Sequence, residues 1–265
     1  MKENTQELYA KAHFHMGLTY HENGLLAEAK AEYEKALFIE PDYYEALNNL
    51  SEIHLREEDP ATAKVLLQRA IKTDPARSLA YVNLGRICVR EGKLDHAVKH
   101  LTKALSCDEE NADALFQMGR ISFKRGDFGA AFRFFDKVLY IDPEYNDLRY
   151  YLGIALLRSG EEDGALEQLK AAADLDRKNY QVLIALGIIY YRKGMKYEAT
   201  KQFRRAVSLK PNSPTAHLNL AIIYCEKRQY ERAIEEYRKY VKYSPGSAKT
   251  EEVQNIIKEL EERKI

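Results

Sequence analysis

Residues 180–213 have the sequence YQVLIALGIIYYRKGMKYEATKQFRRAVSLKPNS, and this stretch decides the fold. Gly194 marks the end of a first helix, because the left-handed residue that follows a helix is usually glycine. Pro211 stops a second helix, because proline cannot continue one. Ala199 and Ala206 are small, as residues must be where two helices cross closely. The stretch therefore predicts two helices joined by a short turn.

The same 34-residue pattern fills residues 10–247 in seven copies, with no insertion or deletion. The predicted repeats are 10–43, 44–77, 78–111, 112–145, 146–179, 180–213 and 214–247. Counting Ala10 as position 1, position 20 is alanine in every copy: Ala29, Ala63, Ala97, Ala131, Ala165, Ala199 and Ala233. Position 7 is always Leu or Met, and position 8 is Gly, Ser or Ala. This agreement indicates a stack of repeats that share one core.

Turn and cap residues recur at fixed places in the repeat. Position 15 is glycine in five copies: Gly24, Gly92, Gly126, Gly160 and Gly194. Asp59-Pro60 predicts an N-cap followed by a first-turn proline for the second helix of the second repeat. Ser213-Pro214 predicts the same arrangement for the first helix of the seventh repeat.

The repeat resembles the tetratricopeptide repeat (TPR) family in these small, large and turn positions. The resemblance implies an all-α fold, a right-handed superhelical α-solenoid of antiparallel helix pairs. It also implies that the first helix of each pair lines a concave groove, with positions 2, 5, 6, 9, 12 and 13 on the groove or its rim. The chain departs from the family at position 4, where the frequent Trp is absent: His13, Leu47, Tyr81, Leu115, Arg149, Leu183 and His217 stand there.

Both ends of the array need a polar cover. In residues 248–265 an apolar stripe predicts a capping helix that lies on the seventh repeat: Val253, Ile256, Ile257 and Leu260. Tyr240 occupies a normally small position and predicts looser packing of that repeat against the cap. Residues 1–9 form a lead-in, and Asn4 with Glu7 predicts a capping box and a helix start near residue 5.

The balance of charged residues and the arrangement of the cysteines limit which cellular compartment and which classes of partner we expect. Lys plus Arg and Asp plus Glu balance at 41 each, which argues against general attraction to nucleic acid or to an anionic membrane. The three cysteines are far apart and form no metal or disulfide pattern. We therefore expect a cytoplasmic protein with reduced thiols, and a removed export signal or lipid anchor remains an alternative.

The groove positions of the middle repeats carry cations and amides. Position 13 is basic in five copies: Arg56, Arg90, Lys124, Arg158 and Arg192. Position 9 is Arg86 and Arg120 in repeats three and four. Position 6 carries Asn49, Asn83, Gln117 and Asn219. Because guanidinium groups suit bidentate capture of carboxylates, these residues predict a site for an acidic ligand. A basic position 13 is common in the family, so that row is either a solvated rim or a ligand contact.

The later repeats instead place apolar residues at groove positions. They are Tyr150, Tyr151, Ile154, Ile184, Ile188, Tyr191 and Ile222, with Leu157, Leu218 and Cys225 beside them. If exposed, such a patch predicts an interface for an amphipathic or apolar segment. The alternative is that neighbouring helices bury these residues. The two halves together predict a ligand that is acidic over repeats two to four and apolar over repeats five to seven.

One specialised family function is disfavoured by the residues. The clamp by which some TPR proteins hold the acidic C-termini of Hsp70 and Hsp90 needs Lys at position 5 and Asn at position 9. The first repeat has Phe14 and Leu18 there, and the second has Asn48 and Glu52. Binding of those chaperone tails is therefore not expected.

No pattern for catalysis, metal or cofactor binding is found. His96 and His100 have the i, i+4 spacing of a metal pair but no third ligand, so a solvated helix face is expected. The prediction is a non-catalytic scaffold or adaptor that binds a peptide or helix of a partner protein in its groove. Alternatives are a recruiting module of a larger enzyme or of a secretion or pilus assembly, and a self-assembling homo-oligomer. The oligomeric state and the partner are not predicted.

Overall fold

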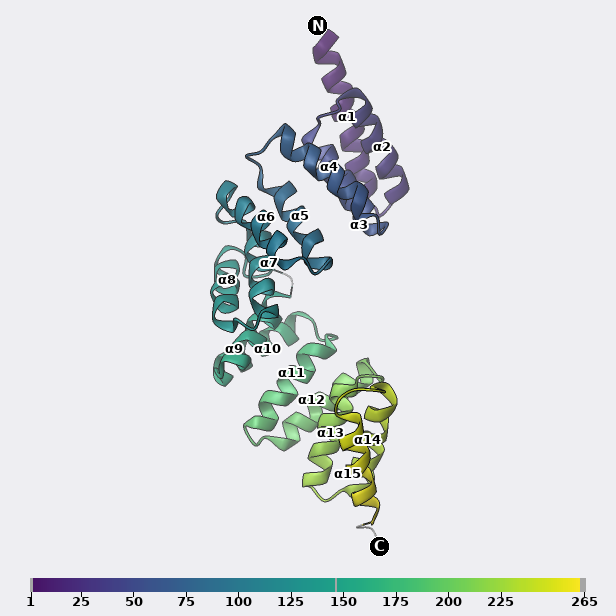
Figure 1. Cartoon of the computed structure of the whole chain (residues 1–265), viewed down its shortest axis with the longest axis vertical. Coiled ribbons are helices and arrows are strands. Elements are labelled where there is room, and N and C mark those ends of the chain that lie inside the picture. The colour runs from purple at the N-terminus through teal and green to yellow at the C-terminus, as the bar shows by residue number, and fades with distance from the viewer. Residues whose placement is uncertain (1, 146, 263–265) are drawn as a thin grey trace. The chain divides into compact units, whose positions relative to one another are not determined.

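The computed structural model describes residues 2–145 and 147–262, and it describes side chains from Thr5 onward. These residues form fifteen helices and no strand (Figure 1). The helices are α1 (Lys2–Glu22), α2 (Leu26–Ile39), α3 (Tyr44–Arg56), α4 (Pro60–Thr73), α5 (Ser78–Arg90), α6 (Leu94–Cys107), α7 (Ala112–Lys124), α8 (Phe128–Ile141), α9 (Leu148–Ser159), α10 (Glu162–Leu175), α11 (Tyr180–Arg192), α12 (Lys196–Leu209), α13 (Pro214–Glu226), α14 (Tyr230–Tyr243) and α15 (Thr250–Glu262). Within the described part of the chain, no helix has the length and apolar character needed to cross a membrane.

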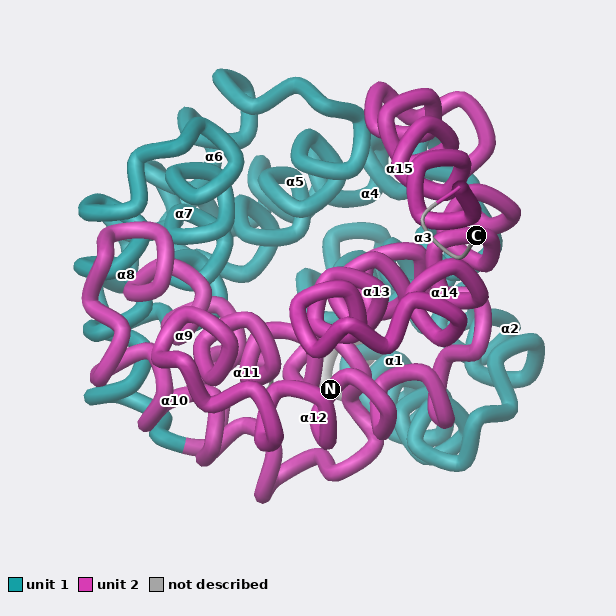
Figure 2. Tube along the Cα trace, turned by 90° about the horizontal axis from the view of Figure 1, so that it is seen from below, with its two compact units in different colours: residues 1–143 teal, residues 144–265 magenta. Residues whose placement is uncertain are grey.

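The chain divides into two compact units, which Figure 2 colours separately. Unit 1, residues 1–143, contains α1 to α8, and unit 2, residues 144–265, contains α9 to α15. In each unit a helix packs on the helix that follows it, and first helices of neighbouring repeats also touch, as α5 does α7 and α11 does α13. Each unit is thus a stack of helix pairs, as the resemblance implied.

Small residues hold the two helices of each pair close together. All seven alanines at position 20 are fully buried. At Gly119 in α7, a Cβ atom would lie 2.5 Å from the ring of Phe135 in α8. At Gly187 in α11, it would lie 2.6 Å from the ring of Phe203 in α12. The large residue at position 24 therefore requires the small residue at position 8.

The turn between the paired helices uses a left-handed residue in every described repeat. The five glycines at position 15 have φ values from 74° to 89°. The two copies that lack glycine adopt the same conformation, with φ of 60° at Glu58 and 55° at Arg228. Because side chains disfavour this region, these two turns carry backbone strain that the others avoid.

Two of the predicted helix starts need correction, and one is confirmed. Asp59 caps α4 as predicted, its Oδ1 accepting from the Thr62 backbone N–H at 3.1 Å. Ser213 makes no side-chain cap bond, although Pro214 is the first residue of α13 and removes one unpaired donor by lacking an N–H. Helix α1 begins at Lys2 rather than near residue 5, since Lys and Glu favour helix. The side chain of Asn4, and so its capping box, lies outside the described residues.

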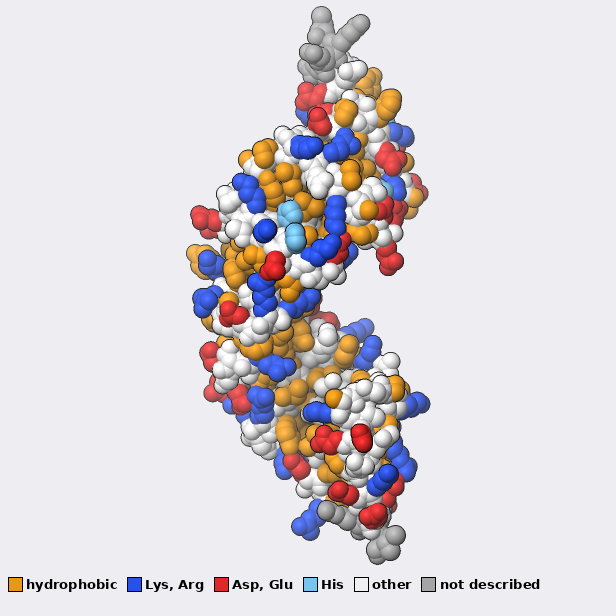
Figure 3. All heavy atoms as spheres, in the orientation of Figure 1, with side chains coloured by type: hydrophobic (Ala, Val, Ile, Leu, Met, Phe, Trp, Pro, Cys, Tyr) orange, Lys and Arg blue, Asp and Glu red, His pale blue; other side chains and the backbone are white. Residues whose placement is uncertain are grey.

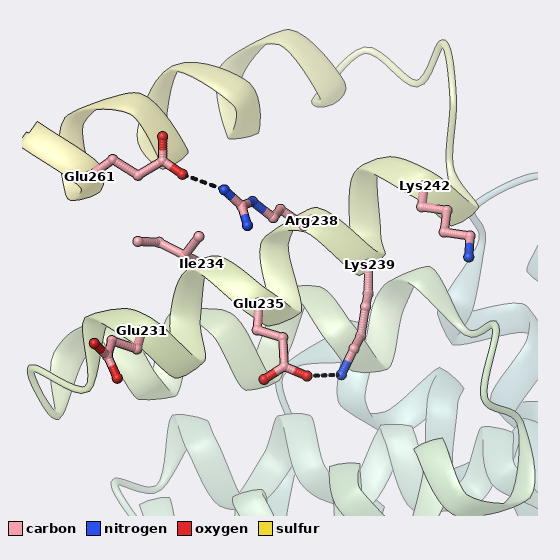
Figure 4. A pocket seen from close by; sticks show the side chains of 7 residues that line it. All are labelled: Glu231, Ile234, Glu235, Arg238, Lys239, Lys242 and Glu261. Carbon is pink, nitrogen blue, oxygen red and sulfur yellow. Dashed lines mark hydrogen bonds and ion pairs between the residues drawn. The ribbon is translucent and has the colours of Figure 1, made fainter.

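Helix α15 covers the last repeat as the apolar stripe predicted. Val253 and Leu260 are buried in a cluster with Tyr240, and Ile256 and Ile257 pack against it. The Tyr240 hydroxyl hydrogen-bonds with Ser247 Oγ at 2.8 Å, which anchors the connection to α15. Figure 4 shows a second link, in which Arg238 of α14 reaches Glu261 of α15 at 2.7 Å. The outsized residue at position 27 is thus accommodated by the cap.

Candidate protein-interaction surfaces

Unit 1 presents a row of exposed cations on α3, α5 and α7. Arg56, Arg90 and Lys124 at position 13 are all exposed, and Arg86 at position 9 is exposed on the same helix as Arg90. Arg56 pairs with Glu52 one turn earlier at 2.9 Å, a contact of little net stability for exposed groups. Arg86, Arg90 and Lys124 make no ion pair with any described residue. Three of the predicted cations therefore keep their charge available for a ligand.

Buried amides support the two position-9 arginines. Asn83 is 8% exposed, and its Oδ1 accepts from Arg86 Nη1 at 3.4 Å. Gln117 is 7% exposed and accepts in the same way from Arg120 at 3.3 Å. Arg120 is half-buried, and its guanidinium lies 6.0 Å from the Phe116 ring centroid. The same amide–arginine unit is therefore built twice, one repeat apart, with the guanidinium held by a buried acceptor.

The remaining amides do not form a continuous ladder. Asn49 is half-buried and donates to the Tyr33 hydroxyl at 3.3 Å. Asn219, in unit 2, donates to the Thr215 carbonyl within its own helix at 2.8 Å. Position 5 also differs from the expectation that it faces the groove. Its residues in repeats two to four are buried in unit 1: Asn48, Val82 and Phe116. These side chains are part of the core, and the ring of Phe116, for example, lies 5.6 Å from that of Phe135 in α8.

In unit 2 the predicted apolar residues are only partly accessible. Leu157 is buried at 7% exposure, while Ile154, Ile184, Ile188 and Ile222 are half-buried. Ile184 and Ile188 pack against the cluster that contains α12 to α15. Figure 3 shows hydrophobic side chains gathered over α11 and α12 on the face in view. The structure therefore lies between the two alternatives, because neighbouring helices cover much of each side chain but leave the isoleucines partly accessible.

The tyrosines of unit 2 are ordered by contacts with each other and with charge. Tyr150 and Tyr151 are half-buried, with their rings 5.4 Å apart in an edge-on arrangement. Burial raises the pKa of Tyr150, so its hydroxyl stays neutral. Tyr191 donates to Glu226 Oε1 at 2.5 Å, and Lys196 pairs with the other oxygen of Glu226 at 2.9 Å. The repeat pattern gave no sign of this Tyr–Glu–Lys link between α11, α12 and α13.

The last two position-13 cations behave differently from each other. Arg158 is exposed and makes no ion pair with a described residue, whereas Arg192 lies 3.6 Å from Glu162. The row is therefore partly an ion-paired rim and partly a set of accessible charges, in unit 2 as in unit 1.

Three repeats contain a polar pair where the family frequently has Trp. The pairs join positions 4 and 23 of one repeat: His13–Glu32 at 2.6 Å, Arg149–Gln168 at 3.1 Å and His217–Glu236 at 2.5 Å. His217 is 1% exposed, and its Nε2 donates to the Pro211 carbonyl at 2.8 Å. Burial lowers the pKa of His217, but the hydrogen bonds from both ring nitrogens to acceptors outweigh it, so the pKa is raised and the charged imidazole is favoured. His217 is thus part of the core, and the identity of its partner could not be read from position 4 alone.

Among the described residues, no three His, Cys, Asp or Glu side chains gather as metal ligands. His96 is exposed and His100 half-buried on α6. Burial lowers the pKa of His100, with a smaller contribution from His96.

Family comparison decides what these repeats are. Profiles described as tetratricopeptide repeat match residues 20–84, 54–115, 89–146, 122–185 and 184–248. The chain belongs to the tetratricopeptide repeat family. Members of this family are generally non-catalytic scaffolds for protein interactions, which supports that class for this TPR chain. No curated protein matches the sequence.

Solved TPR structures share the fold at low sequence identity. YrrB, described as a TPR protein with an unusual peptide-binding site, is 24% identical, with a TM-score of 0.60, 71% of this chain covered and 97% of that chain. PilF of Pseudomonas aeruginosa is 20% identical, with a TM-score of 0.71 and coverage of 80% and 96%. Yeast Tom70 is 19% identical, with a TM-score of 0.59 and coverage of 99% and 55%. At these identities the likeness establishes the fold alone.

Proposed function

We propose that the chain is a non-catalytic adaptor that binds an acidic segment of a partner protein on unit 1. The observation that carries the proposal is the repeated amide–arginine unit, Asn83 with Arg86 and Gln117 with Arg120. A guanidinium that is already oriented by a buried acceptor loses less side-chain freedom when it binds a carboxylate. Exposed Arg90 and Lys124 lie one turn further along the same two helices and add positive charge. The peptide-binding site named for YrrB is consistent with this proposal.

For unit 2 we propose a contact with an apolar segment, through Ile154, Ile184, Ile188 and Ile222. Half-burial reduces the apolar area that each isoleucine can offer. A ligand would therefore gain less free energy here than from fully exposed side chains, since the gain is proportional to the area removed from water.

The cationic site can be tested by titration with a labelled acidic peptide, followed by fluorescence anisotropy. Hydrogen bonds to charged groups contribute roughly 1.5–3 kcal/mol, so we expect Arg86→Glu with Arg120→Glu to weaken binding by at least about tenfold. The dependence of affinity on salt should also become shallower.

A matched control is Lys99→Glu with Lys103→Glu on α6, which makes the same charge change at two exposed residues. If both double variants weaken binding equally, only the total charge matters and the proposed site is wrong. Unchanged affinity in the arginine variant would also refute it.

A further inference from the structure

The neutral total charge conceals a strongly basic segment in unit 2. Residues 192–242 contain thirteen Lys and Arg, five Glu and no Asp. The segment runs from the end of α11 through α12 and α13 to the end of α14. Its excess of eight positive charges is offset by acidic residues elsewhere in the chain, including unit 1, which has nineteen Lys and Arg against twenty-three Asp and Glu.

Part of this basic charge is neutralised within the chain and the rest is not. Figure 4 shows the neutralised kind, with Arg238 on Glu261 and Lys239 on Glu235, each at 2.7 Å, while Lys242 has no carboxylate beside it. Within the described chain, eight cations of the segment make no ion pair: Lys201, Arg204, Arg205, Lys210, Lys227, Arg228, Arg232 and Lys242. The excess is therefore held at accessible side chains on α12, α14 and the turn before α14.

Two of these cations line one pocket between α12 and α14. The pocket has a volume of about 280 Å³, with Val207, Leu220 and Tyr224 as its apolar and aromatic lining beside Arg204 and Arg232. Arg204 Nε donates to the Tyr224 hydroxyl at 3.1 Å, which orients its guanidinium. Leu220 and Tyr224 are buried, so half-buried Val207 supplies most of the accessible apolar surface beside the two arginines.

Two carboxylates also line the pocket, but both already pair with cations of this chain. Glu235 accepts from Lys239 at 2.7 Å. Glu236 is shared between Lys239 at 3.0 Å and His217 at 2.5 Å. The carboxylates therefore leave Arg204 and Arg232 uncompensated.

We propose that this pocket and the adjoining face of α12 bind an acidic segment of a partner protein, separately from the unit 1 site. Carboxylates of the segment pair with Arg204 and Arg232, and an apolar side chain packs on Val207. Lys201 and Arg205, one turn apart on α12, extend the basic surface. A nucleic-acid backbone would match the charges but would leave the apolar lining unused, so a protein segment fits better.

The test uses the full chain and a fluorescein-labelled peptide of glutamates around one central phenylalanine. The unit 1 site is first inactivated by Arg86→Glu with Arg120→Glu, so that a failure of one site is distinguishable from a failure of the other. In that background, Arg204→Gln with Arg232→Gln should weaken binding about tenfold or more. Replacing the peptide phenylalanine by alanine should weaken peptide binding to the chain that carries only the two unit 1 substitutions. The same peptide change should have little effect on binding to the chain that also carries Arg204→Gln and Arg232→Gln.

For the face of α12 that carries Lys201 and Arg205, another repeat offers a control pair at the same repeat positions. Lys201 and Arg205 occupy positions 22 and 26, as Lys99 and Lys103 do in the third repeat. Lys201→Glu with Arg205→Glu should weaken peptide binding severalfold, whereas Lys99→Glu with Lys103→Glu should change it less than about twofold. Circular dichroism spectra of all variants should match the parent.

Three outcomes would overturn the proposal. Equal losses of peptide affinity in the α12 and α6 variants would show that only the total charge of the chain determines binding. If the phenylalanine and alanine peptides bind with equal affinity, the pocket does not take up an apolar side chain. Tighter binding of a single-stranded oligonucleotide or of phosphatidylserine vesicles than of the peptide, abolished by the same arginine substitutions, would assign the surface to a different class of partner.

Discussion

Replacing Glu58 by glycine should stabilise the chain. Glu58 is exposed and holds φ at 60° in the turn between α3 and α4, where five other repeats have glycine. A side chain in the left-handed region costs about 1–2 kcal/mol. Glycine also gains freedom in the unfolded chain, which costs roughly 0.4–1 kcal/mol. The difference leaves a net stabilisation of roughly 0.5–1 kcal/mol.

Thermal and urea unfolding, followed by far-ultraviolet circular dichroism, would measure this gain. For a chain of this size we expect a rise in melting temperature of about 1–4 °C. Because repeat arrays unfold in segments, hydrogen exchange in α3 and α4 should report the effect most directly. The control is Glu58→Gln, which removes the charge but keeps a side chain. If the glutamine variant is as stable as the glycine variant, backbone strain at this turn is not the cause.

Two further changes test the packing and the buried ion pair. Gly119→Ala should destabilise unit 1 by about 1–3 kcal/mol, because the new methyl group would overlap Phe135, and a melting temperature equal to that of the parent would refute the tight crossing. Burial alone lowers the pKa of His217, but hydrogen bonds to Glu236 and the Pro211 carbonyl outweigh it and raise that pKa, while nearby Lys239 opposes them. The stabilisation by His217 is therefore complete below its unfolded pKa of about 6.5 and is lost as the pH rises through the raised pKa of the folded state. Melting temperatures measured from about pH 6 upward should therefore fall more in the parent than in His217→Gln.

The sequence predicted most of the fold because the repeat reports the same constraint seven times. The small residue at position 8 and the alanine at position 20 both follow from the same close helix crossing. Because seven copies agree at these positions, a chance occurrence in one copy could not have produced the prediction. The stripe from Val253 to Leu260 was equally readable, since a capping helix needs one apolar face. What could not be read was the conformation of Glu58 and Arg228, because their side chains give no sign of the left-handed backbone that tertiary packing imposes.

The candidate sites were predicted less well, because exposure depends on neighbours that sequence spacing does not specify. Arg86 is exposed and Arg120 half-buried, whereas the amides beside them, which were expected to contact ligand directly, are buried. For Leu157 and the isoleucines of unit 2 the sequence left exposure and burial as alternatives, and packing against neighbouring helices covers much of them. The pairing of His217 with Glu236 joins residues nineteen apart, on two helices whose mutual rotation decides the contact.

The polar pairs between positions 4 and 23 affect which first helix can pair with which second helix while the seven similar repeats fold. Each pair links the first and second helix of a single repeat, and the corresponding residues of the second repeat are Leu47 and Leu66. If α13 docked on the second helix of any of repeats two to six, which have no carboxylate at position 23, His217 would lose its partner, and a buried unpaired charge costs several kcal/mol. We infer that the His–Glu pairs prevent the first and seventh repeats from exchanging helices with the five repeats between them during folding. Replacing His217 and Glu236 together by leucine should then leave stability nearly unchanged while lowering the yield of correctly refolded monomer.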